Sequence, residues 1–215
     1  MYVKEYMNTN VITVSSDTPI HDAEKIMRDH KIRRLPVVDE GKLVGVITRD
    51  KLREVAPSPI TPLALWELDY LLAKMKVRDA MEKELFTIIP DTTVEQAVSE
   101  AQKRGIGTLL VVDKDKPNKL LGIATTTDLY KLTTEILGFD QPGVRLHVLE
   151  TSKVGSCQEV VGIINKRGVR ILSMFHVTPP GVGKEDCIFH LGTEDASQIL
   201  DELKSKGYRA QIRTR

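Results

Sequence analysis

An internal repeat limits the folds open to this chain more than any other feature of its sequence. When the sequence is shifted by 74 residues, residues 3–39 fall on residues 77–113, and after a three-residue insertion at 114–118 the shift becomes 77. The matched pairs include Val3 and Val77, Met7 and Met81, Thr13 and Thr87, Asp17 and Asp91, Ala23 and Ala97, Leu35 and Leu109, Gly45 and Gly122, and Thr48 and Thr125. Such a repeat predicts two copies of one supersecondary unit that pack as a pair.

Each copy predicts the order β-α-β-β-α. The first helix of each copy begins at a threonine, Thr18 before Pro19 and Thr92 with Glu95 at capping-box spacing, and Gly105 ends the second of these helices. Its expected buried face carries Val94, Ala97, Val98 and Ala101. The expected strands are residues 11–14, 35–38 and 43–48 in the first copy and 85–89, 109–112 and 120–125 in the second, each copy closing with a helix.

The segment between the copies is expected to be a linker. Residues 56–62 contain three prolines, which is too many for regular structure. Residues 63–75 follow with a helical apolar stripe, which we interpret as a helix that covers the joint between the repeats; Trp66 is an alternative dimer contact. The stripe consists of Leu65, Leu68, Leu72 and Met75.

The last part of the chain predicts a separate domain. Strands are expected at 144–149, 169–175, 187–191 and 209–212, and helices at 156–166 and 196–206. This β-α-β-β-α-β order is that of ferredoxin-like domains. The expected fold class of the whole chain is therefore α+β. Its expected divisions are 1–55 (first repeat), 56–76 (linker and helix), 77–138 (second repeat) and 139–215 (C-terminal domain).

Composition argues against several classes of protein. The 31 basic and 30 acidic residues among 215 give a formal charge of +1, so a nucleic-acid partner is not expected. Cys157 and Cys187 lack Cys-x-x-Cys spacing and the five histidines lack His-x-x-x-His spacing, so we expect free thiols and no metal site. With no apolar run of about 18–20 residues and no signal-peptide core, a soluble cytoplasmic protein without a membrane partner is expected.

The repeat resembles the cystathionine-β-synthase (CBS) domain family over residues 1–138. The resemblance is carried by IRRLPVVD at 32–39 with GVIT at 45–48, and by GIATTTD at 122–128. It implies two clefts between the paired sheets that bind AMP, ADP, ATP, S-adenosylmethionine or a related molecule as a regulatory ligand. The residues implied as ligand-binding are Ile12, Thr13, Arg33, Pro36, Thr48, Lys51, Phe86, Thr87, Gly107, Leu110, Thr125 and Asp128.

Thr125 and Asp128 permit two interpretations. An aspartate accepts hydrogen bonds from a ribose diol, and a helix N-terminus offers N–H groups to a phosphate. Thr-x-x-Asp ahead of an apolar helix face is also a capping box. Its position in a recognisable repeat favours the ribose contact.

The first copy differs at the equivalent position, because Lys51 stands three residues after Thr48. An ammonium group cannot accept a hydrogen bond from a ribose diol, so we expect two unequal clefts. Lys51 with Arg33 and Arg34 either receives phosphates or forms part of an ordinary solvated surface.

The C-terminal part resembles the ACT family of small regulatory domains. Val154-Gly155 opening the helix, then GVRILS at 168–173, carry this resemblance. Gly155 is the one position implied for an amino-acid ligand, and Val154 stands where the family usually has proline. A purely structural, pairing domain is an equal alternative. A CBS pair followed by an ACT-like domain resembles AcuB-type proteins associated with acetoin utilisation.

The leading hypothesis is a non-catalytic sensor that binds an adenosine-containing ligand and signals through a homodimer to a protein partner. The alternatives are an amino-acid-sensing ACT regulator with a structural CBS pair, and an accessory subunit of a nucleotide-metabolising enzyme. No catalytic residues, catalytic cofactor or catalytic barrel of about 200 residues are expected. The glycines and lysine at 179–184 lack the order of a phosphate loop, and we interpret them as a turn.

Overall fold

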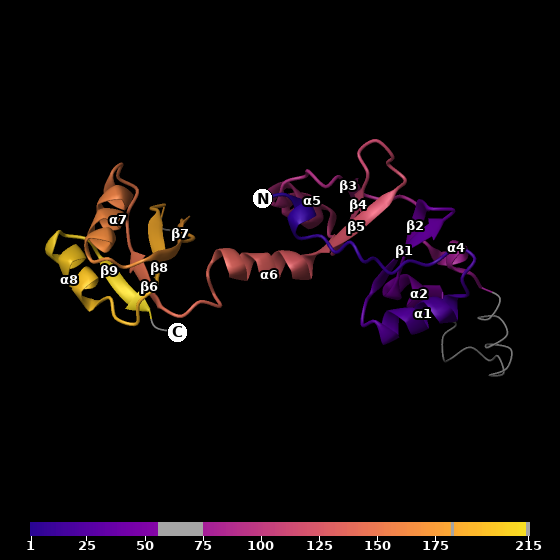
Figure 1. Ribbon diagram of the computed structural model, residues 1–215, viewed down its shortest axis with the longest axis horizontal. Helices are drawn as coiled ribbons and strands as arrows, with labels where there is room; N and C mark the ends of the chain where they lie inside the picture. Colours follow the sequence, from indigo (N-terminus) through magenta and orange to yellow (C-terminus); the bar gives the residue numbers. More distant parts are fainter. Residues whose placement is uncertain (56–74, 182, 214–215) are drawn as a thin grey trace. The chain divides into compact units, whose positions relative to one another are not determined.

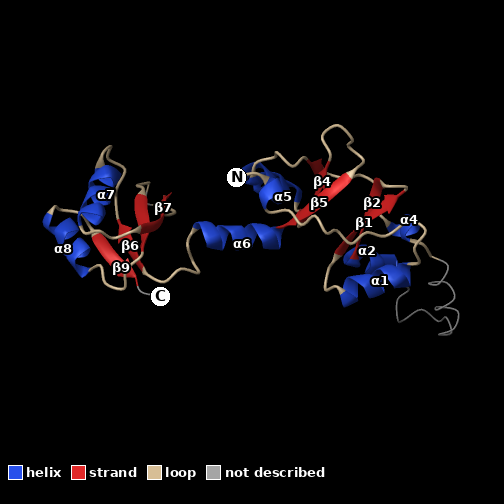
Figure 2. Ribbon diagram, in the orientation of Figure 1, coloured by secondary structure: helices blue, strands red, loops and turns tan. Residues whose placement is uncertain are grey.

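The computed structural model describes residues 1–55, 75–181 and 183–213 and divides the chain into two units, Met1–Leu129 and Tyr130–Arg215 (Figure 1). Both units combine helices with strands, which confirms the expected α+β class (Figure 2). The linker and helix expected between the repeats, with Trp66 and most of the leucine stripe, lie outside the described residues.

The first repeat forms a helix, a hairpin and a second helix. Its elements are α1 (Ile20–Asp29), β1 (Arg34–Asp39), β2 (Lys42–Thr48) and α2 (Arg49–Val55). Glu40 and Gly41 join the two antiparallel strands with φ angles of 49° and 75°, as a tight two-residue hairpin turn requires. The expected strand at 11–14 is reduced to one parallel bridge between Val14 and Val37. Helix α1 begins one residue later than expected, with Pro19 at the cap position.

The second repeat adds one short strand to the same plan. Its elements are β3 (Thr87–Ile88), α5 (Val94–Arg104), β4 (Thr108–Val112), β5 (Leu120–Thr125) and α6 (Thr126–Ile136). Strand β3 lies parallel to β4, which pairs antiparallel with β5. The capping box of α5 consists of Thr93 and Gln96, so the prediction of Thr92 and Glu95 was wrong by one residue. Gly105 ends the helix with a φ of 63°, as expected.

The start of each repeat packs on the other repeat. The two short turns concerned are η1 (Val3–Glu5) and α4 (Val77–Ala80). The backbone N–H of Val3 donates to the carbonyl of Thr92 at 2.9 Å, and that of Val77 donates to the carbonyl of Thr18 at 2.8 Å. This exchange ties the two repeats together through their backbones.

Apolar side chains fill a core in each repeat and a third cluster between them. The third cluster joins Leu43 of β2 to Leu110 and Val112 of β4, so the repeats pack through their sheets. Val98 of α5 departs from the expected pattern, because 41% of it is exposed whereas its helix neighbours Ala97 and Ala101 are buried.

The second unit has the expected β-α-β-β-α-β order. Its elements are β6 (Val144–Val148), α7 (Ser156–Lys166), β7 (Ile171–Val177), β8 (Asp186–Leu191), α8 (Ser197–Ser205) and β9 (Ala210–Arg213). All strand pairs are antiparallel, in the order β7-β8-β6-β9. Residues of α7 and α8, including Val160, Ile163 and Leu203, form one buried cluster with Leu146 and Phe189 of the sheet.

Candidate ligand-binding site

Two cavities of the first unit are lined by residues that the sequence predicted as ligand-binding, and both repeats contribute to each of them. The first, cavity 1, has a volume of about 630 Å³. Its lining residues are Asn8, Asn10, Ile12, Lys31, Ile32, Arg33, Arg34, Pro36, Val46, Gly107, Thr108, Leu110, Ile123, Thr125, Thr126 and Thr127. The volume lies within the range of about 300–1,000 Å³ that small-molecule sites occupy.

The second, cavity 2, has a volume of about 530 Å³. Its lining residues are Arg33, Arg34, Val46, Thr48, Asp50, Lys51, Glu54, Glu82, Glu84, Leu85, Phe86, Arg104, Gly105, Ile106, Thr108 and Leu110. Cavities 1 and 2 therefore share Arg33, Arg34, Val46, Thr108 and Leu110.

The two cavities differ in charge. Lys31, Arg33 and Arg34 line cavity 1, and no Asp or Glu of the described residues does so. Cavity 2 has four basic residues, but the carboxylates of Asp50, Glu54, Glu82 and Glu84 balance them. Cavity 1 therefore offers the more favourable surroundings for a phosphate.

Arg34 is held at the boundary of the two cavities. Its Nη1 donates to Oγ1 of Thr108 at 3.3 Å, and it passes so close to Gly107 that a Cβ at that glycine would stand 2.9 Å from Nη1. Because Gly107 has no side chain, the guanidinium group of Arg34 has room beside it. This gives the predicted residue Gly107 a physical role next to the cavity.

Thr125 and Asp128 form a helix cap at the edge of cavity 1. The backbone N–H and the hydroxyl of Thr125 donate to Asp128 Oδ2 at 2.8 and 2.6 Å, and the Asp128 N–H donates to Thr125 Oγ1 at 3.3 Å. Thr125 lines the cavity, whereas Asp128 lines neither cavity. The capping interpretation therefore describes the arrangement of these side chains, and the ribose contact stays a prediction.

Lys51 is engaged by a neighbouring carboxylate. Its Nζ donates to Glu54 Oε2 at 2.6 Å, and its backbone N–H donates to Thr48 Oγ1 at 3.2 Å. The hydrogen bond and charge of Glu54 raise the pKa of Lys51. Because the carboxylate of Glu54 already compensates the charge of this ammonium group, Lys51 attracts a phosphate less strongly than its sequence position suggested.

The remaining predicted residues divide between the cavities. Ile12, Pro36 and Leu110 form apolar walls of cavity 1, and Phe86 lines cavity 2 with Arg104 stacked 4.1 Å from its ring centroid. The structure does not bring every predicted residue to a cavity. Thr13 and Thr87 line neither cavity, although Thr87 pairs with Leu110 in the sheet.

Several cavity residues escaped the sequence analysis. Asn8 and Asn10 precede the first predicted strand, and Asn8 reaches cavity 1 because its backbone pairs with Ile123 of the other repeat. Arg104 and Glu82 reach cavity 2 from a helix end and from the turn after α4. The signal available in the sequence was that Arg104 precedes Gly105, which ends α5, and that Glu82 follows Met81, the residue matched to Met7 in the repeat.

Gly155 lies in the second unit, at the N-cap of α7. It has a φ of 91°, and a Cβ there would meet nothing within 4 Å. A positive φ of this size favours glycine at this position, so the residue type is explained even if no ligand binds there. An amino-acid site at Gly155 stays a prediction.

Among the described residues, no helix is both long and apolar enough to cross a membrane.

The sequence matches the CBS domain model at residues 3–58 and again at 77–135. A CBS domain-containing protein of Dictyostelium discoideum is 33% identical over 136 residues, which are 63% of this chain and 92% of that protein. Inosine-5'-monophosphate dehydrogenase of Bacillus subtilis is 34% identical over 128 residues, but these span only 23% of the enzyme.

Solved structures resemble the first unit. The CBS domain pair of protein MJ0100, in complex with 5'-methylthioadenosine and S-adenosylmethionine, has a TM-score of 0.51 and 28% identity, covering 63% of this chain and 97% of that one. CBSX2 in complex with AMP has a TM-score of 0.52 and 27% identity over 63% of this chain and 98% of that one. A putative acetoin utilization protein (AcuB) from Vibrio cholerae shares the fold, with a TM-score of 0.54 and 23% identity over 65% of this chain and 95% of that one.

Proposed function

The chain belongs to the CBS-domain family, and we propose that it is a non-catalytic regulatory protein that binds an adenosine-containing ligand between its two repeats. AMP, ADP, ATP and S-adenosylmethionine are the candidate ligands. The complexes of MJ0100 and CBSX2 support this class, since each holds an adenosine compound in a protein similar to the first unit of this chain.

The charge of cavity 1 is the observation that carries the proposal. Its apolar walls at Ile12, Pro36 and Leu110 suit an adenine ring, and its basic residues Arg33 and Arg34 suit a phosphate. No Asp or Glu of the described part of the chain lines it. We therefore propose cavity 1 as the main nucleotide site and cavity 2, with its four carboxylates, as the weaker one.

The shared arginines supply a means of signalling between the cavities. Arg33 and Arg34 line both, so a phosphate that draws a guanidinium group toward cavity 1 removes positive charge from cavity 2. Each ligand therefore changes the affinity for the other, because coupling between two sites is reciprocal.

The second unit is proposed as an ACT-like domain that pairs with its own kind. Its β-α-β-β-α-β order supports this assignment, and residues 139–215 are the proposed domain. We propose further that the protein is cytoplasmic, that it forms a homodimer, and that ligand binding changes its contact with a protein partner. An AcuB-type role in acetoin utilisation belongs to the same proposal.

Calorimetric titration of the full chain with AMP, ADP, ATP and S-adenosylmethionine tests the proposal. At a concentration of about 100 times its dissociation constant, a ligand should also stabilise the protein by about 2.7 kcal/mol in thermal unfolding. The proposal fails if none of the four binds. Parallel titrations with amino acids test the alternative of an amino-acid-sensing regulator, and a heat signal with amino acids alone would favour it.

A further inference from the structure

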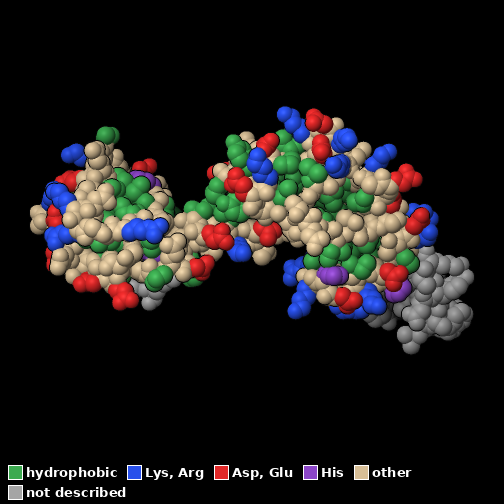
Figure 3. Space-filling model, viewed as in Figure 1, with side chains coloured by type: hydrophobic (Ala, Val, Ile, Leu, Met, Phe, Trp, Pro, Cys, Tyr) green, Lys and Arg blue, Asp and Glu red, His purple; other side chains and the backbone are tan. Residues whose placement is uncertain are grey.

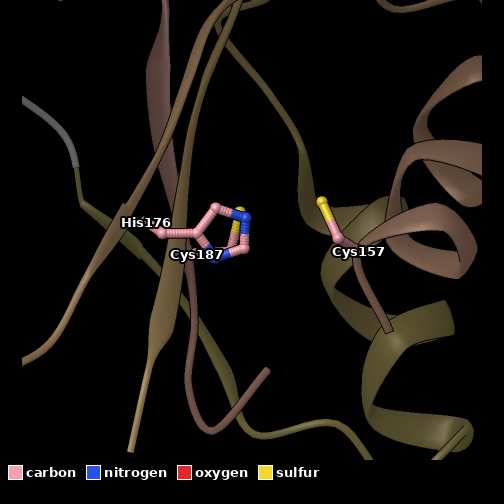
Figure 4. A group of neighbouring side chains, drawn as sticks. All are labelled: Cys157, His176 and Cys187. Atoms are coloured by element: carbon pink, nitrogen blue, oxygen red, sulfur yellow. The ribbon is translucent and has the colours of Figure 1, made fainter. Parts of the chain in front are cut away.

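A cluster of soft donor atoms lies in the second unit, and none of its residues lines cavity 1 or cavity 2. It consists of Cys157 in the first turn of α7, His176 on β7 and Cys187 on β8. The two sulfur atoms and one ring nitrogen all lie within 4.8 Å of one another. Figure 4 shows His176 and Cys187 extending from the strands toward Cys157.

The fold assembles this cluster from residues that are distant in sequence. His176 and Cys187 are direct partners in the antiparallel pair of β7 and β8, so their side chains project from the same face of the sheet. Cys187 belongs to the buried core beneath the helices, and Cys157 packs against that core. The absence of a metal-binding spacing in the sequence therefore did not exclude a three-dimensional cluster.

Two thiols and an imidazole are the donor types that zinc prefers. In a tetrahedral site, sulfur and nitrogen donors at ordinary zinc distances stand about 3.5–4 Å apart. The present spacing is within about 1 Å of that value, which side-chain rotation alone can supply. We propose that Cys157, His176 and Cys187 bind one Zn²⁺ ion, with a fourth position open to water.

The surroundings of the three side chains support this proposal. Cys187 is buried, Cys157 is half-buried and His176 is exposed, so the cluster extends from the core of the second unit to its surface. A divalent cation would compensate the charge of both thiolates, and each thiol would release one proton to solvent when the ion binds.

The bound ion would have a structural consequence. It would join the start of α7 to β7, which lies at the edge of the sheet, and to the inner strand β8. The thioether of Met174, 3.6 Å from Cys157 Sγ, adds a further soft sulfur atom beside the site. Zinc would thus be a second input to the protein, separate from the proposed nucleotide site.

The test uses the untagged full chain, reduced and freed of metal by a chelator. Competition against a chromophoric zinc chelator should show one Zn²⁺ per chain. C157S and C187S should each weaken zinc affinity more than about 100-fold. Loss of a residue that only hydrogen-bonds to a metal ligand already weakens metal affinity by about 10–100-fold, and loss of a ligand itself should cost more. H176N should weaken it clearly, whereas H21N, which changes an exposed histidine beside Asp22, should bind as the parent does.

Two further measurements keep the proposal testable if a cysteine variant fails to fold. Zn²⁺ should protect Cys157 of the parent from alkylation. It should protect Cys157 poorly in H176N, a variant that we expect to fold because the side chain at position 176 is exposed. Co²⁺ should give the absorption of a tetrahedral thiolate complex in the parent. Zinc binding that survives in C157S, C187S and H176N, or a reduced parent that binds no zinc and simply forms a disulfide in air, would overturn the assignment.

Discussion

The hydroxyl of Thr125 donates a 2.6 Å hydrogen bond to Oδ2 of Asp128, and the Asp128 N–H returns a 3.3 Å hydrogen bond to Thr125 Oγ1. Asp128→Ala removes this cap, and we expect a loss of about 1 kcal/mol in the free energy of unfolding. If Asp128 also accepts hydrogen bonds from a ribose, the variant should lose about 1.5–3 kcal/mol of binding as well, a roughly ten- to hundredfold weaker affinity.

Denaturant unfolding and calorimetry of the same variant separate the two roles of Asp128. Asn at this position keeps one acceptor oxygen and should fall between Asp and Ala in affinity. An Ala variant that is less stable but binds AMP like the parent would show that Asp128 acts as a helix cap alone.

Arg34→Ala should weaken AMP binding about ten- to hundredfold, because it removes a charged donor from cavity 1. Gly107→Ala is the complementary change: its Cβ would stand 2.9 Å from Arg34 Nη1, so the guanidinium group must move. We expect weaker AMP binding here too, with unfolding free energy changed by less than about 1 kcal/mol. Arg28→Ala, on the exposed side of α1, is the control, and an equal loss of affinity there would contradict the assignment.

Glu54→Gln should improve binding in cavity 2. Lys51 donates to this carboxylate at 2.6 Å, and the variant releases the ammonium group while removing one negative charge. The pKa of Lys51 should fall back toward its ordinary value of 10.5, so the group stays charged at neutral pH. Calorimetry should show a gain for ATP that exceeds the gain for AMP. Glu24→Gln on α1 should change neither affinity.

Gly162→Ala should stabilise the second unit. Gly162 lies inside α7, and a Cβ there would meet nothing within 4 Å. Alanine restricts the unfolded chain and favours the helix by about 0.5–1 kcal/mol. Denaturant unfolding followed by circular dichroism measures this gain, and a destabilised variant would indicate that the face of α7 at Gly162 is covered by another surface.

The Cys187 thiol should resist alkylation in the metal-free folded protein. Burial first, and the Cys157 sulfur second, raise its pKa to about 12 from an ordinary value of 9.0. In the folded protein the thiol therefore stays neutral above pH 9, where the thiol of the unfolded chain loses its proton, and the free energy of unfolding falls between about pH 9 and 12. Iodoacetamide at pH 8 should label Cys157 first, with mass spectrometry locating the label; early labelling of Cys187 would contradict the prediction.

Local sequence signals determined most of the elements. The repeat predicted both hairpins, since Leu35 and Leu109 occupy equivalent buried positions, and the boundaries of α7 were predicted to the residue. The start of α5 was predicted one residue too early, because two adjacent threonines can each cap a helix and the N-cap is Thr93 and not Thr92. Short strands such as residues 11–14 depend on a neighbour to pair with, which local sequence does not specify.

The sequence by itself determined the repeated unit, the order of elements and many of the residues around the two cavities. Only the tertiary structure decided that Val3 packs on the second repeat and Val77 on the first, and that Arg34 stands between two cavities of different charge. It also brought Cys157 and Cys187 together. Periodicity and capping act over a few neighbouring residues, whereas burial, charge balance and donor clusters depend on distances between segments far apart in the chain.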